Sequence, residues 1–149
     1  MTRTGRAIML GTAIAGTLDL LSAFVFGGMA GASPTQILAA VASGPFPGTG
    51  PGAVTTVVGT MVHYTIMAAM VAAFVLAARR LPTLINHPVV SGLLYGGALY
   101  LVMYWLVLPL RFPAAHPKSD WWTITNALFS HCICVGLPIA FITRAVRAR

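Results

Sequence analysis

The feature that most restricts the fold of this chain is its division into four long apolar stretches. They lie roughly at residues 7–30, 53–78, 89–108 and 121–143. Each is close to the about 20 apolar residues that a helix needs to cross a bilayer. Only 7% of the 149 residues are charged, whereas soluble domains carry about 25%. The sequence therefore predicts an all-α fold, a polytopic transmembrane four-helix bundle that forms one membrane domain over residues 1–149.

Glycine and proline separate the predicted spans. Residues 44–52 contain three prolines and four glycines, which remove backbone donors and favour turns, so no helix is expected to continue there. Pro82 and Pro88 mark the second break, and Pro109, Pro113 and Pro117 mark the third.

A short additional helix is expected between the first two spans. Ser33 suits an N-cap and Pro34 the first helical position, where the missing N–H costs nothing. Ile37, Leu38 and Val41 then share one face at helical spacing. Because about ten residues cannot cross a bilayer, we predict an interfacial or re-entrant helix after the first span.

The distribution of basic residues predicts the orientation. Seven arginines lie at the N-terminus, the second loop and the C-terminus, whereas the first and third loops hold only Arg111 and Lys118. By the positive-inside rule, both termini are cytoplasmic. Trp105, Trp121 and Trp122 then fall at the outer interface, which indole rings favour. The basic residues form no stripe interleaved with aromatic residues, so we exclude nucleic acid and take the lipid bilayer as the partner.

Three ionisable side chains lie near the middle of three different predicted spans: Asp19, His63 and His131. All three lie about 15 Å from the outer ends of their spans. Ionisable groups at this depth are costly in hydrocarbon and usually face the bundle interior or a water-filled cavity, so they are candidates for a functional site. We expect Asp19 to lie closer to His63 than to His131, because consecutive helices tend to be neighbours.

Small and polar residues flank these positions at helical spacing, as is typical of helix contacts in membranes. The faces comprise Gly11, Ala15 and Asp19 on the first span, Gly59 and His63 on the second, Gly92, Gly96, Tyr100 and Tyr104 on the third, and Asn126 and Ser130 beside His131 on the fourth. We therefore predict a binding or proton-relay site that consists of Asp19, His63, His131, Tyr100 and Asn126. Gly92 and Gly96 are predicted to pack helices and to offer a contact for a homo-oligomer.

Three kinds of function remain open. The first is an accessory or structural role in the membrane, alone or within a larger membrane complex, in which the polar residues fix helix register. The second is proton-linked transport of a small molecule, or a proton relay, through Asp19, His63 and His131. The third is binding of b-type haem or a metal through His63 and His131, because bundle cores hold such cofactors.

Catalysis is not expected. The chain has no P-loop, nucleophile elbow or dinucleotide fingerprint, and it has only two acidic residues, so no catalytic residue is assigned. Cys132 and Cys134 are about 200° apart around a helix, which argues against a disulfide between them. No four ligands converge on a metal, so no metal site is assigned.

The segment from Ile37 to His63, which includes LAAVASGPFPGTGPG, resembles small uncharacterised bacterial inner-membrane proteins. In these, a short helix ending in Ala-Ser-Gly precedes a glycine-rich loop and a span with a central histidine. The resemblance implies a bacterial four-span inner-membrane protein. It implies no activity and no site residue.

Overall fold

The computed structural model describes residues 1–115 and 120–148, and every regular element in this part of the chain is a helix. Four helical stretches are long and apolar enough to cross a membrane, with mean hydropathies between 1.6 and 1.9 over their most apolar windows. Their bounds are Arg3–Met29 for α1, Ala53–Arg80 for α3, Pro88–Arg111 for the third span and Trp121–Ala148 for the fourth. The predicted all-helical, four-span architecture is confirmed, and each helix extends a few residues beyond its predicted range.

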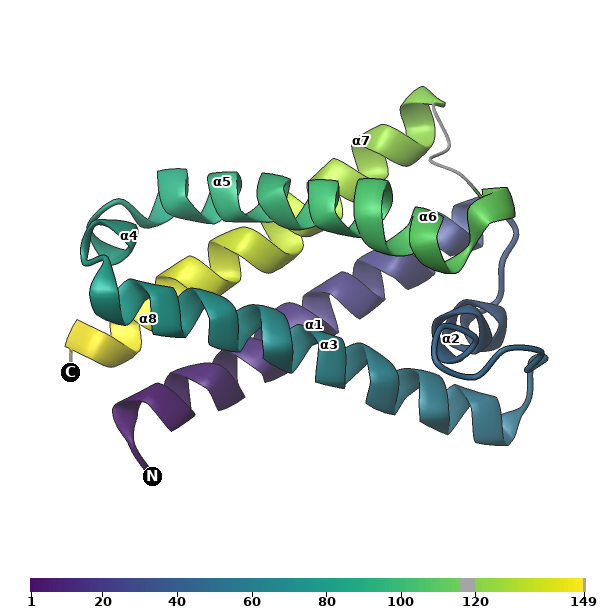
Figure 1. Cartoon of the computed structure of the whole chain (residues 1–149), viewed down its shortest axis with the longest axis horizontal. Helices are drawn as coiled ribbons and strands as arrows, with labels where there is room; N and C mark the ends of the chain where they lie inside the picture. Colours follow the sequence, from purple (N-terminus) through teal and green to yellow (C-terminus); the bar gives the residue numbers. More distant parts are fainter. Residues whose placement is uncertain (116–119, 149) are drawn as a thin grey trace.

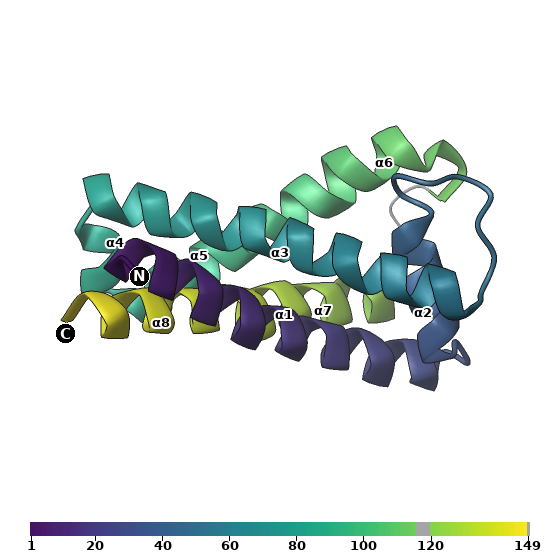
Figure 2. The same cartoon turned by 90° about the horizontal axis from the view of Figure 1, so that it is seen from below.

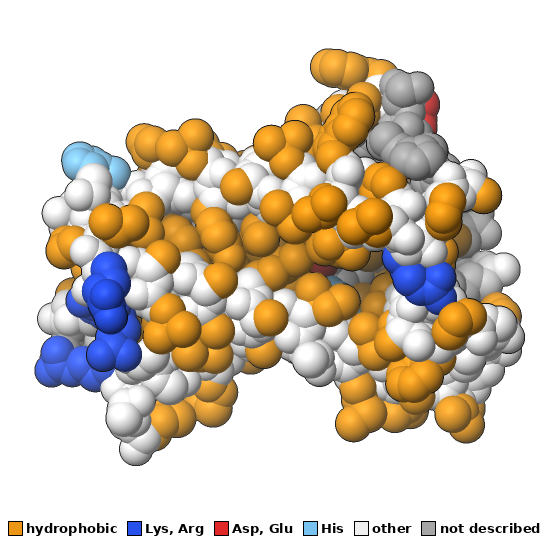
Figure 3. Space-filling view, viewed as in Figure 1, with side chains coloured by type: hydrophobic (Ala, Val, Ile, Leu, Met, Phe, Trp, Pro, Cys, Tyr) orange, Lys and Arg blue, Asp and Glu red, His pale blue; other side chains and the backbone are white. Residues whose placement is uncertain are grey.

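Both termini lie at the same end of the bundle (Figure 1). Lysine and arginine side chains gather at that end, while apolar side chains cover much of the remaining visible surface (Figure 3). Leu94 and Val25, for example, are 70% and 59% exposed. A surface this apolar is typical of contact with lipid. We call the end that holds the termini the Arg-rich end, which carries Arg3, Arg6, Arg79, Arg80, Arg144 and Arg147, and the opposite end the distal end. Lys118 and Arg149 lie outside the described residues.

The third and fourth spans are not uniform α-helices. In the third, α5 (Pro88–Leu101) passes through a π-helical segment, η1 (Val102–Val107), into α6 (Leu108–Arg111). In the fourth, α7 (Trp121–Phe129) passes through η3 (Ser130–Gly136) into α8 (Leu137–Ala148). Each π-segment therefore ends directly before a Leu-Pro pair.

Proline accounts for both π-segments. A proline ring clashes with the carbonyl four residues earlier, which is Trp105 for Pro109 and Cys134 for Pro138. Widening the helix relieves such a clash, and here the N–H of the leucine before each proline bonds to a carbonyl five residues back, at Met103 and Cys132. The third span, predicted to end roughly at Leu108, continues through Pro109 to Arg111. Of the two other prolines expected in the third break, Pro113 begins a short 3₁₀ turn, and Pro117 lies outside the described residues.

The short helix between the first two spans is α2 (Pro34–Ala42). It begins with a capping box: the Gln36 N–H donates to Ser33 Oγ at 3.3 Å, and the Ser33 N–H donates to Gln36 Oε1 at 2.7 Å. It lies across the distal end of the bundle, between the start of α3 and the end of α6 (Figures 1 and 2). A Cβ at Gly59 would lie 2.7 Å from the Leu38 carbonyl carbon, so glycine permits this close contact with α3.

Two arginines join helices at opposite ends of the bundle. At the distal end, Arg111 donates to the carbonyls of Gly44 and, at 2.8 Å, Ser43, just past α2. At the Arg-rich end, Arg147 donates to the Ala78 carbonyl in the last turn of α3. Both cations therefore satisfy carbonyls at a helix C-terminus, where positive charge is favoured. Two single-turn elements complete the loops, α4 (Thr83–Asn86) and the 3₁₀ turn η2 (Pro113–Ala115).

Glycines join the third and fourth spans. A Cβ at Gly92 would lie 2.9 Å from the Gly136 carbonyl oxygen, and one at Gly96 would lie 2.5 Å from the Cys132 Cα. Gly136, which the sequence analysis did not single out, lies on the other side of the same contact. The Gly92 and Gly96 face thus packs within the chain against the fourth span. It is therefore not free to contact a second copy, although a homo-oligomer contact had been predicted there.

Candidate functional site: a pocket above Asp19

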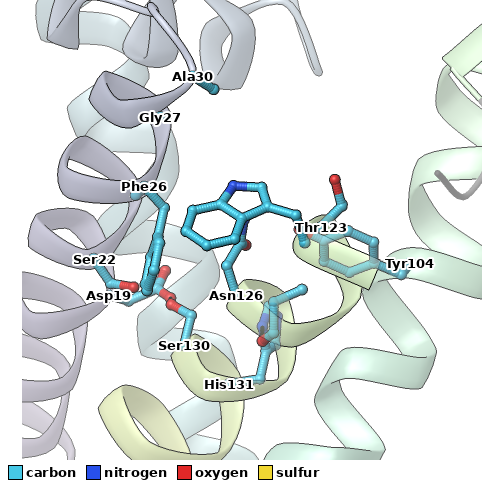
Figure 4. Close-up of a pocket in the computed structure, with 13 residues that line it drawn as sticks. Asp19, Ser22, Phe26, Gly27, Ala30, Tyr104, Thr123, Asn126, Ser130 and His131 are labelled. Atoms are coloured by element: carbon cyan, nitrogen blue, oxygen red, sulfur yellow. Dashed lines mark hydrogen bonds between the residues drawn. The ribbon is translucent and has the colours of Figure 1, made fainter. Parts of the chain in front are cut away.

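A pocket of about 350 Å³ lies in the distal half of the bundle. It extends from Asp19, in the middle of α1, to Ala30 at the end of that helix, and Trp122 at the start of α7 borders it. Figure 4 shows side chains of α1, η1 and the fourth span around this space. The lining residues that matter below are Asp19, Ser22, Phe26, Tyr104, Trp122, Asn126, Ser130 and His131.

Both π-segments contribute to this pocket. Tyr104 lies in η1, and Ser130 and His131 begin η3. A π-turn contains one more residue than an α-helical turn, and one added residue rotates the preceding part of a helix by about 100°. If these segments were α-helical, the same side chains would therefore point in other directions. The pocket therefore depends on the local backbone that Pro109 and Pro138 impose, and π-helical segments are frequent at functional sites.

Asp19 connects the pocket to the interior of the bundle through its two carboxylate oxygens. Ser130 Oγ donates a hydrogen bond to Oδ1 at 2.5 Å, from the pocket wall. On the other side, Oδ2 lies 4.0 Å from His63 Nδ1. The Asp19 and His63 side chains are 22% and 11% exposed, so this pair is largely shielded from solvent and lipid.

The hydrogen bond on the far side of His63 fixes where the ring carries its proton. His63 Nε2 lies 2.9 Å from the Gly16 carbonyl oxygen. A carbonyl can only accept, so Nε2 must be the donor. In the neutral ring, Nδ1 is then an unprotonated acceptor that faces the Asp19 carboxylate. Two acceptors that face each other are best satisfied by a proton on one of them, so the Asp19–His63 pair is suited to hold a proton.

His131 is fixed by the same reasoning, within its own helix. Its Nδ1 lies 2.9 Å from the Ala127 carbonyl, so Nδ1 is the donor and Nε2 remains an acceptor in the neutral ring. The rings of Tyr100 and Tyr104 meet the His131 ring edge-on, with centroids 6.3 Å and 5.9 Å away. His131 lines the pocket, but it does not belong to the Asp19–His63 pair.

The structure thus brings together most, but not all, of the residues predicted for the site. Asp19, His131 and Asn126 line the pocket, and His63 lies directly behind Asp19. Tyr100 does not line the pocket. It stacks on Tyr104 with ring centroids 5.1 Å apart, and Tyr104 takes the place in the wall that we had given to Tyr100.

Sequence reasoning did not assign Ser130, Tyr104 or Trp122 to the site. Ser130 shares a helix face with Asn126, and this spacing was a usable signal. Trp122 was assigned only to the interface, yet it also borders the pocket and its ring lies edge-on to Phe26 at 5.8 Å. Tyr104 was placed by helical spacing on the same face as Gly92, Gly96 and Tyr100, so this spacing was a usable signal too, but only Tyr100 was assigned to the site.

The chain was compared with known proteins at three levels. No family model matches it, and neither a curated protein nor a solved structure shows significant similarity.

The hydrogen bonds of the two histidines bear on the predicted haem site. In the neutral rings His63 Nδ1 and His131 Nε2 carry no proton, but His63 Nδ1 faces the Asp19 carboxylate 4.0 Å away and His63 does not line the pocket. Within the described residues, no three His, Cys, Asp or Glu side chains converge as metal ligands. Haem binding stays an untested prediction.

Proposed function

We propose that this protein is a proton-linked membrane transporter for a small polar molecule, in which the Asp19–His63 pair carries the proton. One observation carries the proposal: Asp19 bonds to the pocket wall through one oxygen and faces a histidine of fixed tautomer through the other. A molecule that binds in the pocket therefore acts on the same carboxylate that shares a proton with His63.

Packing on the two sides of Asp19 supports this proposal. The pocket lies on the distal side of Asp19, whereas on the Arg-rich side the centre of the bundle is filled by buried side chains such as Val71, Phe74 and Ile139, all at most 2% exposed. A binding site near mid-depth with a packed barrier on one side fits one state of an alternating-access cycle.

The proposal includes an orientation. With the Arg-rich end in the cytoplasm, the pocket lies in the outer half of the bundle, and α2 lies in the outer interface as a cover for the bundle end. In a bacterium this places the protein in the inner membrane. A second copy would have to bind elsewhere than at Gly92 and Gly96, which the fourth span already covers.

An accessory or structural role is the second candidate, and a specific contact favours it. The Ser130–Asp19 hydrogen bond joins the fourth span to the first, and hydrogen bonds of this kind hold membrane helices together without any further activity. The two proposals differ in whether Asp19 affects proton movement or stability alone.

Proton flux into liposomes separates them. The purified protein is reconstituted into vesicles that contain a pH-sensitive dye and a mixture of small polar solutes (tetramethylammonium, betaine and glucose) that the protein could exchange, and a potassium gradient with valinomycin drives protons inward. We expect flux above that of protein-free vesicles, and a loss of about tenfold in Asp19→Asn, because the amide cannot exchange a proton.

Asp120→Asn is the matched control. Asp120 caps α7 by accepting from the Thr123 N–H at 2.8 Å, and asparagine caps equally well. It makes the same change of charge outside the pocket and should keep the flux. Flux in the unmodified protein that does not exceed that of empty vesicles would contradict transport and favour the structural role.

A further inference from the structure

We infer that the pocket binds a small organic cation, an amine or quaternary ammonium group on an apolar body, in exchange for the proton of the Asp19–His63 pair. This inference rests on the proposed function and names its substrate class. It follows from three properties of the pocket: its charge, its aromatic walls and its unused polar groups.

The charge in the pocket has one sign. Asp19 is the only acidic residue in its lining, and no lysine or arginine lines it among the described residues. The titratable groups that face Asp19 are His63 from α3, Tyr104 from η1, and His131 and Cys134 from η3. None of these is a permanent cation, so a cationic ligand would supply the missing partner of the carboxylate.

Aromatic rings stand where the ligand would enter. Phe26 from α1, Trp122 from α7 and Tyr104 from η1 come from three different spans and border the same space (Figure 4). The faces of such rings attract a desolvated ammonium group within about 6 Å of the centroid. Ala23, a small residue on α1, also lines the pocket and leaves room for an apolar body.

A buried hydroxyl adds a third argument. Ser22 is 7% exposed and lines the pocket with Asp19; its Oγ makes no hydrogen bond of normal geometry and has only a weak interaction with the Cys134 thiol. An unsatisfied buried hydroxyl costs stability unless a ligand or water meets it. An ammonium N–H or a bridging water at Asp19 would use this acceptor.

Charge balance sets the stoichiometry. With a proton on the pair, Asp19 and His63 are together neutral. When a cation binds to the carboxylate, the proton leaves to the solution, and the charge of the site stays constant. Each bound cation should therefore release about one proton, which couples ligand binding to proton movement in opposite directions.

The test uses benzyltrimethylammonium and its uncharged carbon isostere, neopentylbenzene. Both are titrated into the purified full-length protein in detergent, and binding is followed by calorimetry and by tryptophan fluorescence. A pH dye in weak buffer reports released protons. We expect the cation to bind with release of about one proton, and the isostere, which has the same shape, to bind at least about tenfold more weakly.

Variants identify the site. Asp19→Asn should weaken cation binding about tenfold or more and abolish proton release, whereas Asp120→Asn should change neither. Trp122→Leu, at a half-exposed position, should weaken binding of the cation about threefold or more without affecting the fold. This variant and the neutral isostere keep the test valid if Asp19→Asn does not fold.

Two results would overturn the inference: equal binding of the cation and its isostere, or cation binding that survives Asp19→Asn unchanged. If the cation does not bind but Asp19-dependent proton flux persists, the substrate class is wrong and the proposed function stands. If the cation binds with proton release but the vesicles show no proton flux, the inferred cation binding holds and the proposed transport function is contradicted.

Discussion

The Arg-rich half and the distal half of the bundle use the same four spans but differ in how they fill the space between them. Near the termini, small residues and branched side chains fill the centre of the bundle: Ala15, Val71 and Ile139 are each 0% exposed. The pocket of about 460 Å³ in this half lies between α3, α4 and α5 and is lined mostly by apolar side chains. Beyond Asp19, the first, third and fourth spans leave a pocket of about 350 Å³ between them. Membrane helices associate through close packing and hydrogen bonds rather than hydrophobic burial, so the tight half supplies most of the stability and leaves the open half free to bind.

The largest effect should come from filling the tight contact between the third and fourth spans. We expect Gly96→Leu to destabilise the protein by about 3 kcal/mol or more, because its side chain would meet the backbone at Cys132, 2.5 Å from the new Cβ. Gly97→Leu is the matched control: nothing lies within 4 Å of its Cβ, and it should change stability by less than about 0.5 kcal/mol. Thermal unfolding in detergent measures both, and equal midpoints would show that the glycine contact does not hold the spans together.

Two phenylalanines compare the halves directly. Phe74→Ala, in the tight half at 2% exposure, should cost about 3 kcal/mol through the cavity it leaves. Phe26→Ala, in the pocket wall, should cost only about 1 kcal/mol, because one side of its ring already faces open space. The same unfolding assay applies, and a larger loss for Phe26 would mean that the pocket is collapsed in the membrane.

The smallest effect on stability is expected at Pro138. In Pro138→Ala the clash with the Cys134 carbonyl disappears, so η3 should relax toward an α-helix and turn Ser130 away from Asp19. Stability should change by only about 1 kcal/mol, but proton flux in liposomes should fall strongly. Pro34→Ala, at the exposed first position of α2, is the control. Full flux in Pro138→Ala would show that the π-segment does not position Ser130.

The tight half was more predictable from sequence than the open half. Hydropathy and the charge pattern gave the four spans, and helical spacing placed Gly11, Ala15, Gly92 and Gly96 on contact faces, because all of these depend on α-helical periodicity alone. Periodicity placed Tyr104 and Ser130 on contact faces of their spans, but it could not show which residues of those faces lie beside Asp19, since two π-segments change the register there. The partner of the Gly92 and Gly96 face could not be predicted either, because spacing shows that a face packs but not what packs on it.

The two π-segments also bear on chain length. A π-turn is equivalent to one residue inserted into an α-helix, so η1 and η3 make the third and fourth spans each about one residue longer than an uninterrupted α-helix between the same ends. Removing one residue from 130–136 together with Pro138→Ala would restore an α-helix and leave α8 in place against α1 and α5, whereas a deletion within α1 or α3 would rotate a whole packed face by about 100°. Single-residue deletions that arise in evolution should therefore be tolerated in these two segments when the proline is lost as well, and each would change the shape of the pocket while preserving the packing of the Arg-rich half.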